Sequence, residues 1–277
     1  MNKEIVISTK AEVTISNVMF QKLCQMDSLI FDKIVVEQKT DVLNVELMKK
    51  RGCHLLGKDF FRFQDGKWIN DEIINSYFNL LRVSETNNIL QNSKYKYCVF
   101  LETYFMAALS SNGKEKISLQ EHWTFNKDTI DICMKLWKKV SFYSSHSLES
   151  IKKIIIPCNC LKSHWNLIVV DVKEKTIKTL DSYKEYTISK NNRFKVKEFM
   201  KHIDTKNEYT VEQTKEEFRP QQINSYDCGM FLILNARKIC LQDQYSFSQS
   251  DIFKARKSLF TIIYHQYCDE QVFHYGL

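Results

Sequence analysis

The chain has 277 residues, of which 44% are hydrophobic, so it is long enough to bury a substantial core. With only 6 glycines and 2 prolines, it contains no low-complexity linker. The formal net charge is +7, but the lysines are spread along the sequence, which favours a solvated surface over a nucleic-acid site.

The first residues and the distribution of cysteines indicate in which cellular compartment the protein works. The first residues lack the apolar segment of a secretory signal, and no apolar run is long enough to span a membrane. The 9 cysteines are scattered without CxxC pairs, which predicts free thiols rather than a zinc site. We therefore expect a protein of the cytoplasm or nucleus, a reducing compartment, with no metal and no cofactor.

The N-terminal third predicts one clear helix. Residues 1–40 alternate short apolar and polar runs, which predicts short strands or irregular structure, and residues 41–49 predict a short helix. Residues 70–81 predict an amphipathic helix, because Ile73, Tyr77 and Leu80 recur at helical spacing and Asn70 or Asp71 can cap it. Trp68 lies just before this cap, where a side chain can pack onto the helix.

Strands dominate the middle of the chain and helices lie on both sides of them, which predicts an α+β fold. A strand followed by a helix is expected over 95–109, and a tight turn at Glu174 and Lys175. The other expected strands are 151–157, 164–172, 176–180 and 208–213. The other expected helices are 129–140, 193–203 and 249–267.

Cys228 is predicted to lie in the first turn of a buried helix. It follows Asn224, Ser225 and Asp227, which are residue types that cap helices, and it precedes a long apolar run. The partial positive charge of a helix N-terminus favours a thiolate, and Gly229 allows another backbone to approach. This local context leaves two interpretations open, a packed cysteine or a nucleophile.

A nucleophilic cysteine needs a base and a group that orients the base. His164 is the only histidine that begins a predicted core strand, and Asp181 ends the next strand. In a hairpin these two positions are neighbours, so Asp181 can hold one imidazole nitrogen while the other faces the thiol. The alternatives are a histidine without a catalytic role and a simple turn at Asp181 and Ser182.

These residues resemble the signatures of the Ulp/SENP ubiquitin-like-protein proteases of clan CE. The resemblance lies in the pair His164 and Trp165, the pair Asp181 and Ser182, and the segments 220–231, PQQINSYDCGMF, and 68–75, WINDEIIN. It covers about residues 45–270. We therefore expect an N-terminal extension or accessory segment over 1–40 and a catalytic domain over 41–277. The fold it implies is the adenain/Ulp type of the papain-like superfamily, with a mixed or antiparallel sheet flanked by helices.

The resemblance also implies a role for each site residue. Cys228 is the nucleophile, His164 the general base and then acid, and Asp181 the orienting carboxylate. The side-chain amide of Gln222 and the backbone N–H of Cys228 form the oxyanion hole. The substrate-binding residues are Trp68, Trp165, Asp71 and Gly229, with the two indoles flanking a slot that only Gly-Gly can enter.

The function implied is a cysteine isopeptidase or endopeptidase that cleaves after the C-terminal Gly-Gly of a ubiquitin-like modifier, SUMO first. Ser225 and Tyr226 stand where SUMO-specific members often carry Gly-Ser, so a deubiquitinase or deneddylase is the alternative, including a bacterial effector secreted into the host cytosol. A modifier-binding protein, an acetyltransferase and a nucleic-acid binder are the remaining hypotheses. The expected partners are the modifier and its conjugates, without a membrane or nucleic acid.

Overall fold

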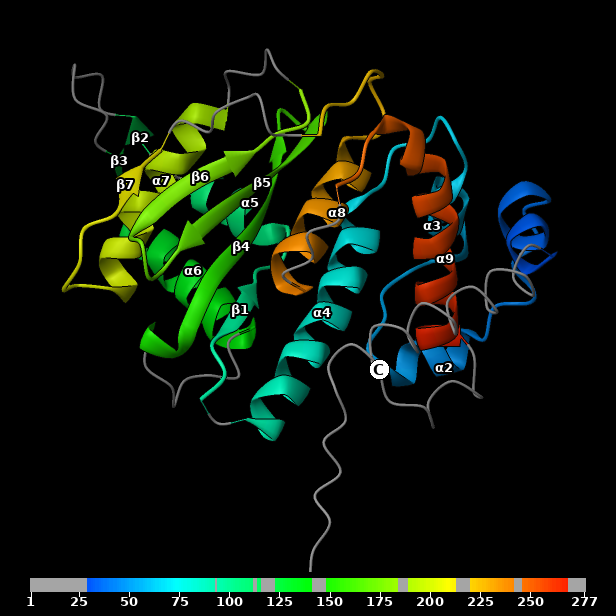
Figure 1. Cartoon of the computed structure of the whole chain (residues 1–277), viewed down its shortest axis with the longest axis horizontal. Helices are drawn as coiled ribbons and strands as arrows, with labels where there is room; N and C mark the ends of the chain where they lie inside the picture. Colours follow the sequence, from blue (N-terminus) through cyan, green and yellow to red (C-terminus); the bar gives the residue numbers. More distant parts are fainter. Residues whose placement is uncertain are drawn as a thin grey trace, which may run out of the picture. The chain divides into compact units, whose positions relative to one another are not determined.

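The structure is a computed structural model that describes residues 29–92, 94–111, 114–115, 123–140, 148–183, 189–212, 220–241 and 246–268 (Figure 1). The chain forms two compact units, Met1–Lys67 with Phe253–Gly276, and Trp68–Ile252 with Leu277. All the candidate site residues belong to the second unit. The domain boundary expected at residue 41 stays a prediction.

The first unit is helical in its described part. Its elements are η1 (Asp32–Val36), α2 (Val45–Lys50), α3 (Gly57–Phe60), η2 (Phe61–Phe63) and all but the first residue of α9 (Ile252–Cys268). The helix expected over 41–49 begins later, after Asn44, whose side chain caps α2. The strand-like expectation for residues 34–36 is wrong, because they lie in the π-helix η1 and Ile34 and Val35 are buried. The other apolar runs of the first 28 residues lie outside the described residues.

Aromatic packing forms the core of the first unit. The ring of Phe260 on α9 lies 5.9 Å from that of Phe60 and 5.7 Å from that of Phe63, both edge-on. Arg256 is fully buried beside them, and its guanidinium donates hydrogen bonds to the backbone carbonyls of Arg62, Gln64 and Lys67. This buried charge is therefore satisfied by the chain that precedes Trp68.

The second unit is built on a five-stranded mixed sheet of order β1-β4-β5-β6-β7. Its strands are β1 (Tyr97–Phe100), β4 (Ile151–Cys160), β5 (His164–Asp171), β6 (Thr176–Leu180) and β7 (Thr210–Val211). The central pairs β4–β5 and β5–β6 are antiparallel, whereas β1–β4 and β6–β7 are parallel. Two further short strands, β2 (Lys114–Glu115) and β3 (Trp123–Thr124), pair with each other. The predicted α+β class with a mixed central sheet is confirmed.

The helices of this unit match most of the expected segments. They are α4 (Asp71–Gln91), α5 (Tyr104–Ser111), α6 (Lys127–Val140), η3 (Leu148–Ser150), α7 (Ser189–Ile203), α8 (Cys228–Leu241) and η5 (Gln249–Asp251). Asn70 is the cap of α4, because its side chain accepts a hydrogen bond from the backbone N–H of Ile73. The helix runs ten residues beyond the segment 70–81, up to Gln91.

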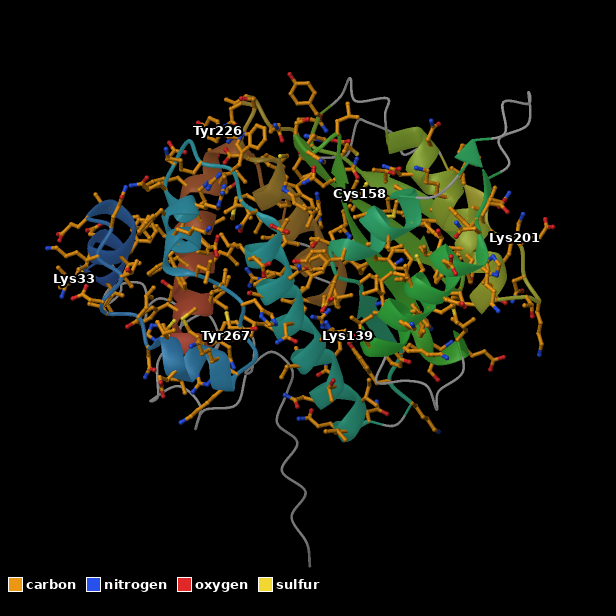
Figure 2. All side chains as sticks on the ribbon, turned by 180° about the vertical axis from the view of Figure 1, so that it is seen from behind. Lys33, Lys139, Cys158, Lys201, Tyr226 and Tyr267 are labelled. Carbon is orange, nitrogen blue, oxygen red and sulfur yellow. The ribbon has the colours of Figure 1, made fainter. Side chains whose placement is uncertain are left out.

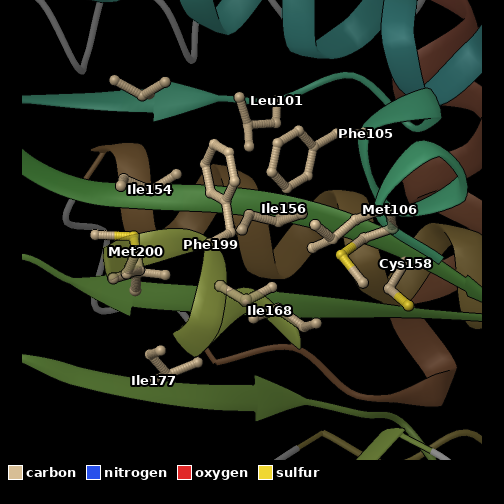
Figure 3. Close-up of a cluster of buried hydrophobic side chains, with 14 of the residues drawn as sticks. Leu101, Phe105, Met106, Ile154, Ile156, Cys158, Ile168, Ile177, Phe199 and Met200 are labelled. Carbon is tan, nitrogen blue, oxygen red and sulfur yellow. The ribbon is translucent and has the colours of Figure 1, made fainter. Parts of the chain in front are cut away.

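Both faces of the sheet are covered. On one face Ile154 of β4 packs in a cluster with Phe105 of α5 and Phe199 of α7, whose rings lie 4.9 Å apart (Figure 3). Ile168 of β5 belongs to this cluster. Its neighbours Leu167 and Val169 are also buried and point to the opposite face of the sheet, where α8 packs against β5. The helix that begins with Cys228 is therefore held against the strand that begins with His164.

A buried carboxyl group ties α4 to β1 and α8. Glu85 is only 1% exposed, and it accepts hydrogen bonds from the Tyr95 hydroxyl at 3.1 Å, the Cys98 backbone N–H and the Cys240 thiol at 3.2 Å. Burial raises its pKa, against the lowering effect of these bonds. The opposite end of α8 from Cys228 is thus fixed to α4.

Two local expectations in the sheet are wrong. The turn between β5 and β6 spans the four residues 172–175, because Asp171 pairs with Thr176, and Lys175 takes a left-handed φ of 56°. The strand expected over 208–213 is only Thr210–Val211 within the described residues.

Basic side chains of this unit lie on separate elements (Figure 2). Lys139 on α6 pairs with Glu102 at 3.1 Å, and Lys201 on α7 pairs with Glu198 at 2.8 Å. The charge of these two lysines is therefore compensated locally. None of the helices in the described ranges combines the length and the apolar character needed to cross a lipid bilayer.

Candidate active site

Cys228 occupies the first position of α8 and is 2% exposed. The carbonyl of Asp227 accepts hydrogen bonds from the N–H groups of Met230 and Phe231, which starts the helix at this point. The side-chain oxygen of Asn224 accepts from the N–H of Asp227 at 3.1 Å and so folds the loop that delivers the thiol. The prediction that Cys228 lies in the first turn of a buried helix is confirmed.

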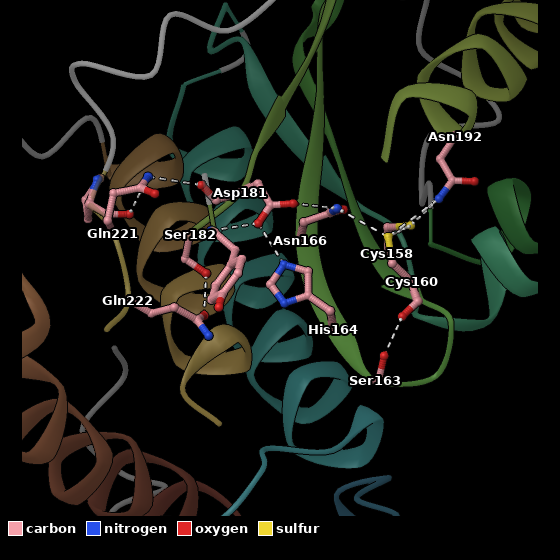
Figure 4. A network of polar contacts seen from close by, with 12 residues as sticks. Cys158, Cys160, Ser163, His164, Asn166, Asp181, Ser182, Asn192, Gln221 and Gln222 are labelled. Atoms are coloured by element: carbon pink, nitrogen blue, oxygen red, sulfur yellow. Dashed lines mark hydrogen bonds and ion pairs between the residues drawn. The ribbon is translucent and has the colours of Figure 1, made fainter. Parts of the chain in front are cut away.

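His164 and Asp181 meet beyond the paired part of the β5–β6 hairpin. The imidazole Nε2 lies 2.7 Å from the Asp181 Oδ1, and the two residues are 6% and 4% exposed (Figure 4). The Cys228 side chain lies close enough to this imidazole to contribute to the rise of its pKa. Because Nε2 is taken by the carboxylate, Nδ1 is the nitrogen available to the thiol. The structure therefore brings together the three side chains that the sequence singled out.

The surroundings of His164 favour its charged form. Burial alone lowers the pKa of its imidazole, but the hydrogen bonds to Asp181 and Cys228 and the negative charge beside it outweigh burial and raise the pKa to about 10. At neutral pH the ring therefore carries a positive charge next to Cys228. A cationic imidazole stabilises a neighbouring thiolate, which is the nucleophilic form of cysteine.

Asp181 is held by donors that the sequence did not point out. The Tyr183 backbone N–H donates to Oδ1 at 2.9 Å, and the Asn166 side-chain N–H donates to Oδ2 at 3.1 Å. Asn166 is 1% exposed and lies two residues after His164, on the same face of β5. The sequence carried a signal for Asn166, because residues two apart on a strand share a face. The strand pairing points the same way: Leu167 pairs with Leu180, so the next residues along, Asn166 and Asp181, are also neighbours.

The network continues behind Asn166 into a pair of thiols. Asn166 also donates to the Cys160 sulfur at 3.3 Å, and the Cys158 and Cys160 sulfurs lie 3.7 Å apart. Asn192 of α7 donates to the Cys158 sulfur at 3.0 Å. The hydrogen bond from Cys158 lowers the pKa of the Cys160 thiol. These contacts fix Asn166 from behind, so Asp181 sits on a rigid support.

Gln222, the predicted oxyanion donor, is attached to the residue after Asp181. Its backbone N–H donates to the Ser182 carbonyl at 2.9 Å, and its side-chain Oε1 accepts from the Ser182 hydroxyl at 2.7 Å. Gln221 donates to the Asp181 carbonyl at 3.4 Å. The loop before α8 is thus joined to the end of β6, and both lie beside His164 (Figure 4).

Two of the predicted substrate-binding residues, Trp165 and Gly229, contact Ile69. The Trp165 indole N–H donates to the Ile69 carbonyl at 3.1 Å, and a Cβ added at Gly229 would lie 2.8 Å from the Ile69 Cβ. Residue 229 must therefore lack a side chain for this approach. Trp68, next to Ile69, is 42% exposed, whereas Trp165 is 7% exposed. Asp71 is half-buried at the start of α4, and its role in binding substrate stays a prediction.

Together these groups can perform nucleophilic acyl transfer. A thiol at a helix N-terminus lies near a cationic imidazole, a carboxylate holds that imidazole, and an amide side chain lies on the adjoining loop. An exposed indole next to the site offers a contact for a substrate chain.

Comparison with known proteins places the chain in a family. Residues 67–270 match the Ulp1 protease family, C-terminal catalytic domain. Ubiquitin-like-specific protease 1 of Saccharomyces cerevisiae is 23% identical over 223 residues, 79% of this chain and 31% of that protein. Sentrin-specific protease 2 of Pongo abelii is 30% identical over 210 residues, 72% of this chain and 30% of that protein.

A solved structure supports the fold. The SUMO protease Ulp1 with its catalytic cysteine oxidized to a sulfinic acid aligns with a TM-score of 0.60 at 22% identity, over 87% of this chain and 95% of that one. The chain spans about a third of the length of the curated relatives it matches, 31% and 30% of the two proteins named above. The chain therefore belongs to the Ulp1 protease family, through the catalytic domain that its residues 67–270 match.

Proposed function

We propose that this chain is a cysteine protease that cleaves the peptide or isopeptide bond after the C-terminal Gly-Gly of a ubiquitin-like modifier, with SUMO as the first candidate. The observation that carries the proposal is the arrangement of His164, whose Nε2 lies 2.7 Å from the Asp181 Oδ1 and whose pKa is raised by the nearby Cys228 at the start of α8. Membership of the Ulp1 protease family agrees with this chemistry.

The reaction would proceed in two steps. The Cys228 thiolate attacks the carbonyl carbon of the last glycine, and the oxyanion formed is stabilised by the Gln222 amide and the Cys228 N–H. The imidazolium of His164 gives its proton to the leaving amine as the C–N bond breaks, which leaves a thioester. His164 then takes a proton from water, the hydroxide adds to the thioester, and the thiolate leaves.

The choice of modifier rests on the entrance to the site and on the relatives. Trp68 precedes Ile69, whose side chain packs against Gly229 next to Cys228, and the Trp165 indole donates to the Ile69 carbonyl. A slot flanked by these two indoles would admit only residues without side chains, which a Gly-Gly terminus supplies. The solved relative is a SUMO protease and the curated relatives are proteases named for ubiquitin-like and sentrin specificity, so SUMO comes first.

The test is covalent capture by activity probes. We would incubate the chain with SUMO, ubiquitin and Nedd-type modifiers that end in propargylamide, and measure the adduct by gel and by peptide mass spectrometry. We expect an adduct at Cys228 with the SUMO probe, and none in Cys228→Ala. Cys133→Ala is the matched control, because this thiol is equally buried but lies in the hydrophobic cluster with α5 and β4.

Two results would count against the proposal. An adduct that persists in Cys228→Ala would show that another thiol reacts. No adduct with any of the three probes, from wild-type protein that unfolds cooperatively, would favour a modifier-binding protein or an acetyltransferase. An adduct with ubiquitin or the Nedd-type modifier alone would support the proposed protease activity but would show that SUMO is not its substrate.

A further inference from the structure

Ser182 makes two contacts with Gln222 that have no part in the triad itself. Its hydroxyl donates to the Gln222 Oε1 at 2.7 Å, and its carbonyl accepts the Gln222 backbone N–H at 2.9 Å (Figure 4). The two residues are 3% and 7% exposed, so water does not compete for the hydroxyl bond. The side chain of Gln222 is therefore held to the strand end that carries Asp181.

The partners of the Gln222 amide determine which way it points. Its Nε2 donates to the backbone carbonyl of Asn224, which can only accept. With the amide reversed, Oε1 would face that carbonyl, and two acceptors repel each other. Asn224 therefore fixes the nitrogen end, and the Ser182 hydroxyl fixes the oxygen end by donating to it.

This arrangement leaves one amide proton uncommitted. The Nε2 group carries two protons, and within the described residues only the bond to the Asn224 carbonyl uses one of them. The second Nε2 proton is therefore available for a hydrogen bond to an oxyanion formed on the substrate at Cys228. Its direction depends on the rotation of the whole side chain, which the two bonds restrict.

We propose that Ser182 is a positioning residue for the oxyanion hole, acting through the Gln222 amide; this inference rests on the proposed protease function. Without the hydroxyl, Oε1 loses its buried donor and the amide is held at one end only. The Gln222 amide must already point at the oxyanion position when negative charge develops there. An amide held at one end only therefore stabilises the transition state less. The competing interpretation is that Ser182 only joins two loops and contributes to stability.

The two interpretations differ in a double-mutant cycle. We would measure kcat and KM on SUMO linked to aminomethylcoumarin for Ser182→Ala, Gln222→Ala and the double variant. We expect Ser182→Ala to lower kcat about tenfold with little change in KM, as for the loss of one buried hydrogen bond. Gln222→Ala should lower kcat about 10²–10³-fold, the range known for one oxyanion donor. In the Gln222→Ala background, Ser182→Ala should change kcat less than about twofold.

A second pair of variants separates the hydroxyl from packing. Ser182→Thr and Ser182→Val add the same bulk to this buried position, but only threonine keeps the donor. We expect kcat of the threonine variant to exceed that of the valine variant about tenfold. Alkylation of Cys228 by iodoacetamide, followed by mass spectrometry of its peptide, should proceed at similar rates in both, because alkylation forms no oxyanion.

The outcomes identify which idea fails. If the wild-type chain cleaves the substrate and Gln222→Ala slows it, but Ser182→Ala retains full kcat, the positioning role is wrong and the protease stands. Additive losses in the cycle, or equal kcat for the threonine and valine variants, would likewise overturn the role. If the wild-type chain cleaves no modifier substrate, the proposed function fails and this inference falls with it.

Discussion

Replacing Asp181 by asparagine should move the alkaline limit of activity. In the wild-type site the pKa of His164 is raised from 6.5 to about 10, and the bond to Asp181 is the largest of the interactions that raise it. The imidazolium is therefore present at neutral pH and is lost as pH rises through about 10. The asparagine variant removes the negative charge of residue 181 but leaves the contribution of Cys228 to the His164 pKa. We therefore expect the alkaline limit of activity to move down by about two pH units.

The expected size of the effect follows from the protonated fraction. With a pKa near 8, about a tenth of the imidazole is protonated at pH 9, whereas most of it is protonated at pH 7. The ratio of wild-type to variant kcat/KM should therefore be about tenfold larger at pH 9 than at pH 7. The assay is hydrolysis of SUMO–aminomethylcoumarin between pH 6 and 10.5. Asp171→Asn is the matched control, since Asp171 ends β5, the strand that begins with His164, and pairs with Lys153.

The network around Asp181 also predicts which imidazole tautomer survives. The Tyr183 N–H lies 2.9 Å from Oδ1 and keeps an oxygen in that place in the asparagine variant. The new NH₂ group then faces Asn166, whose Oδ1 has no partner among the described residues and can rotate toward it. We therefore expect a loss at pH 7 well below the roughly 10⁴-fold that follows tautomer reversal in serine proteases. An alkaline limit that stays near pH 10 in Asp181→Asn would refute the reasoning.

Three further substitutions test the supports of the site. Gly229→Ala places a Cβ 2.8 Å from that of Ile69, so the backbone beside the nucleophile must shift, and kcat/KM should fall roughly 10- to 100-fold with the fold intact by circular dichroism. Trp165→Phe removes the indole bond to the Ile69 carbonyl and should raise KM about fivefold, more than it lowers kcat; an unchanged KM would argue against this contact. Glu85→Ala leaves its buried donors unpaired and should lower the free energy of unfolding in urea by about 3 kcal/mol, whereas the surface control Glu174→Ala should cost less than about 1 kcal/mol.

Local patterns predicted much of the fold because they depend on neighbouring residues. The cap Asn70 and the apolar spacing of Ile73 and Tyr77 located α4, and the polar loop before Cys228 located the start of α8. The four-residue turn after Asp171 was missed because Lys175 takes a left-handed φ of 56°, which neither glutamate nor lysine signals.

The sequence predicted that His164 and Asp181 lie side by side, but it did not predict the groups that support them. His164 and Asp181 could be paired from the hairpin, since antiparallel strands bring such ends together. Asn166 lies two residues after His164 on the same face of β5, so the alternation of the strand carried a signal for it. The bond between Ser182 and Gln222 joins segments 40 residues apart and depends on loop shape, which no periodicity records, so it needed the structure.

The position of Cys228 in the chain has a consequence for synthesis on the ribosome. His164 begins β5 and Asp181 follows β6, and α8, which begins with Cys228, is synthesised after both. A nascent chain that ends before residue 228 therefore carries this imidazole and carboxylate without the thiol that the proposed mechanism needs. Under the proposed mechanism, proteolytic competence requires α8, which packs against β5, so a truncated product that stops before residue 228 would lack the nucleophile.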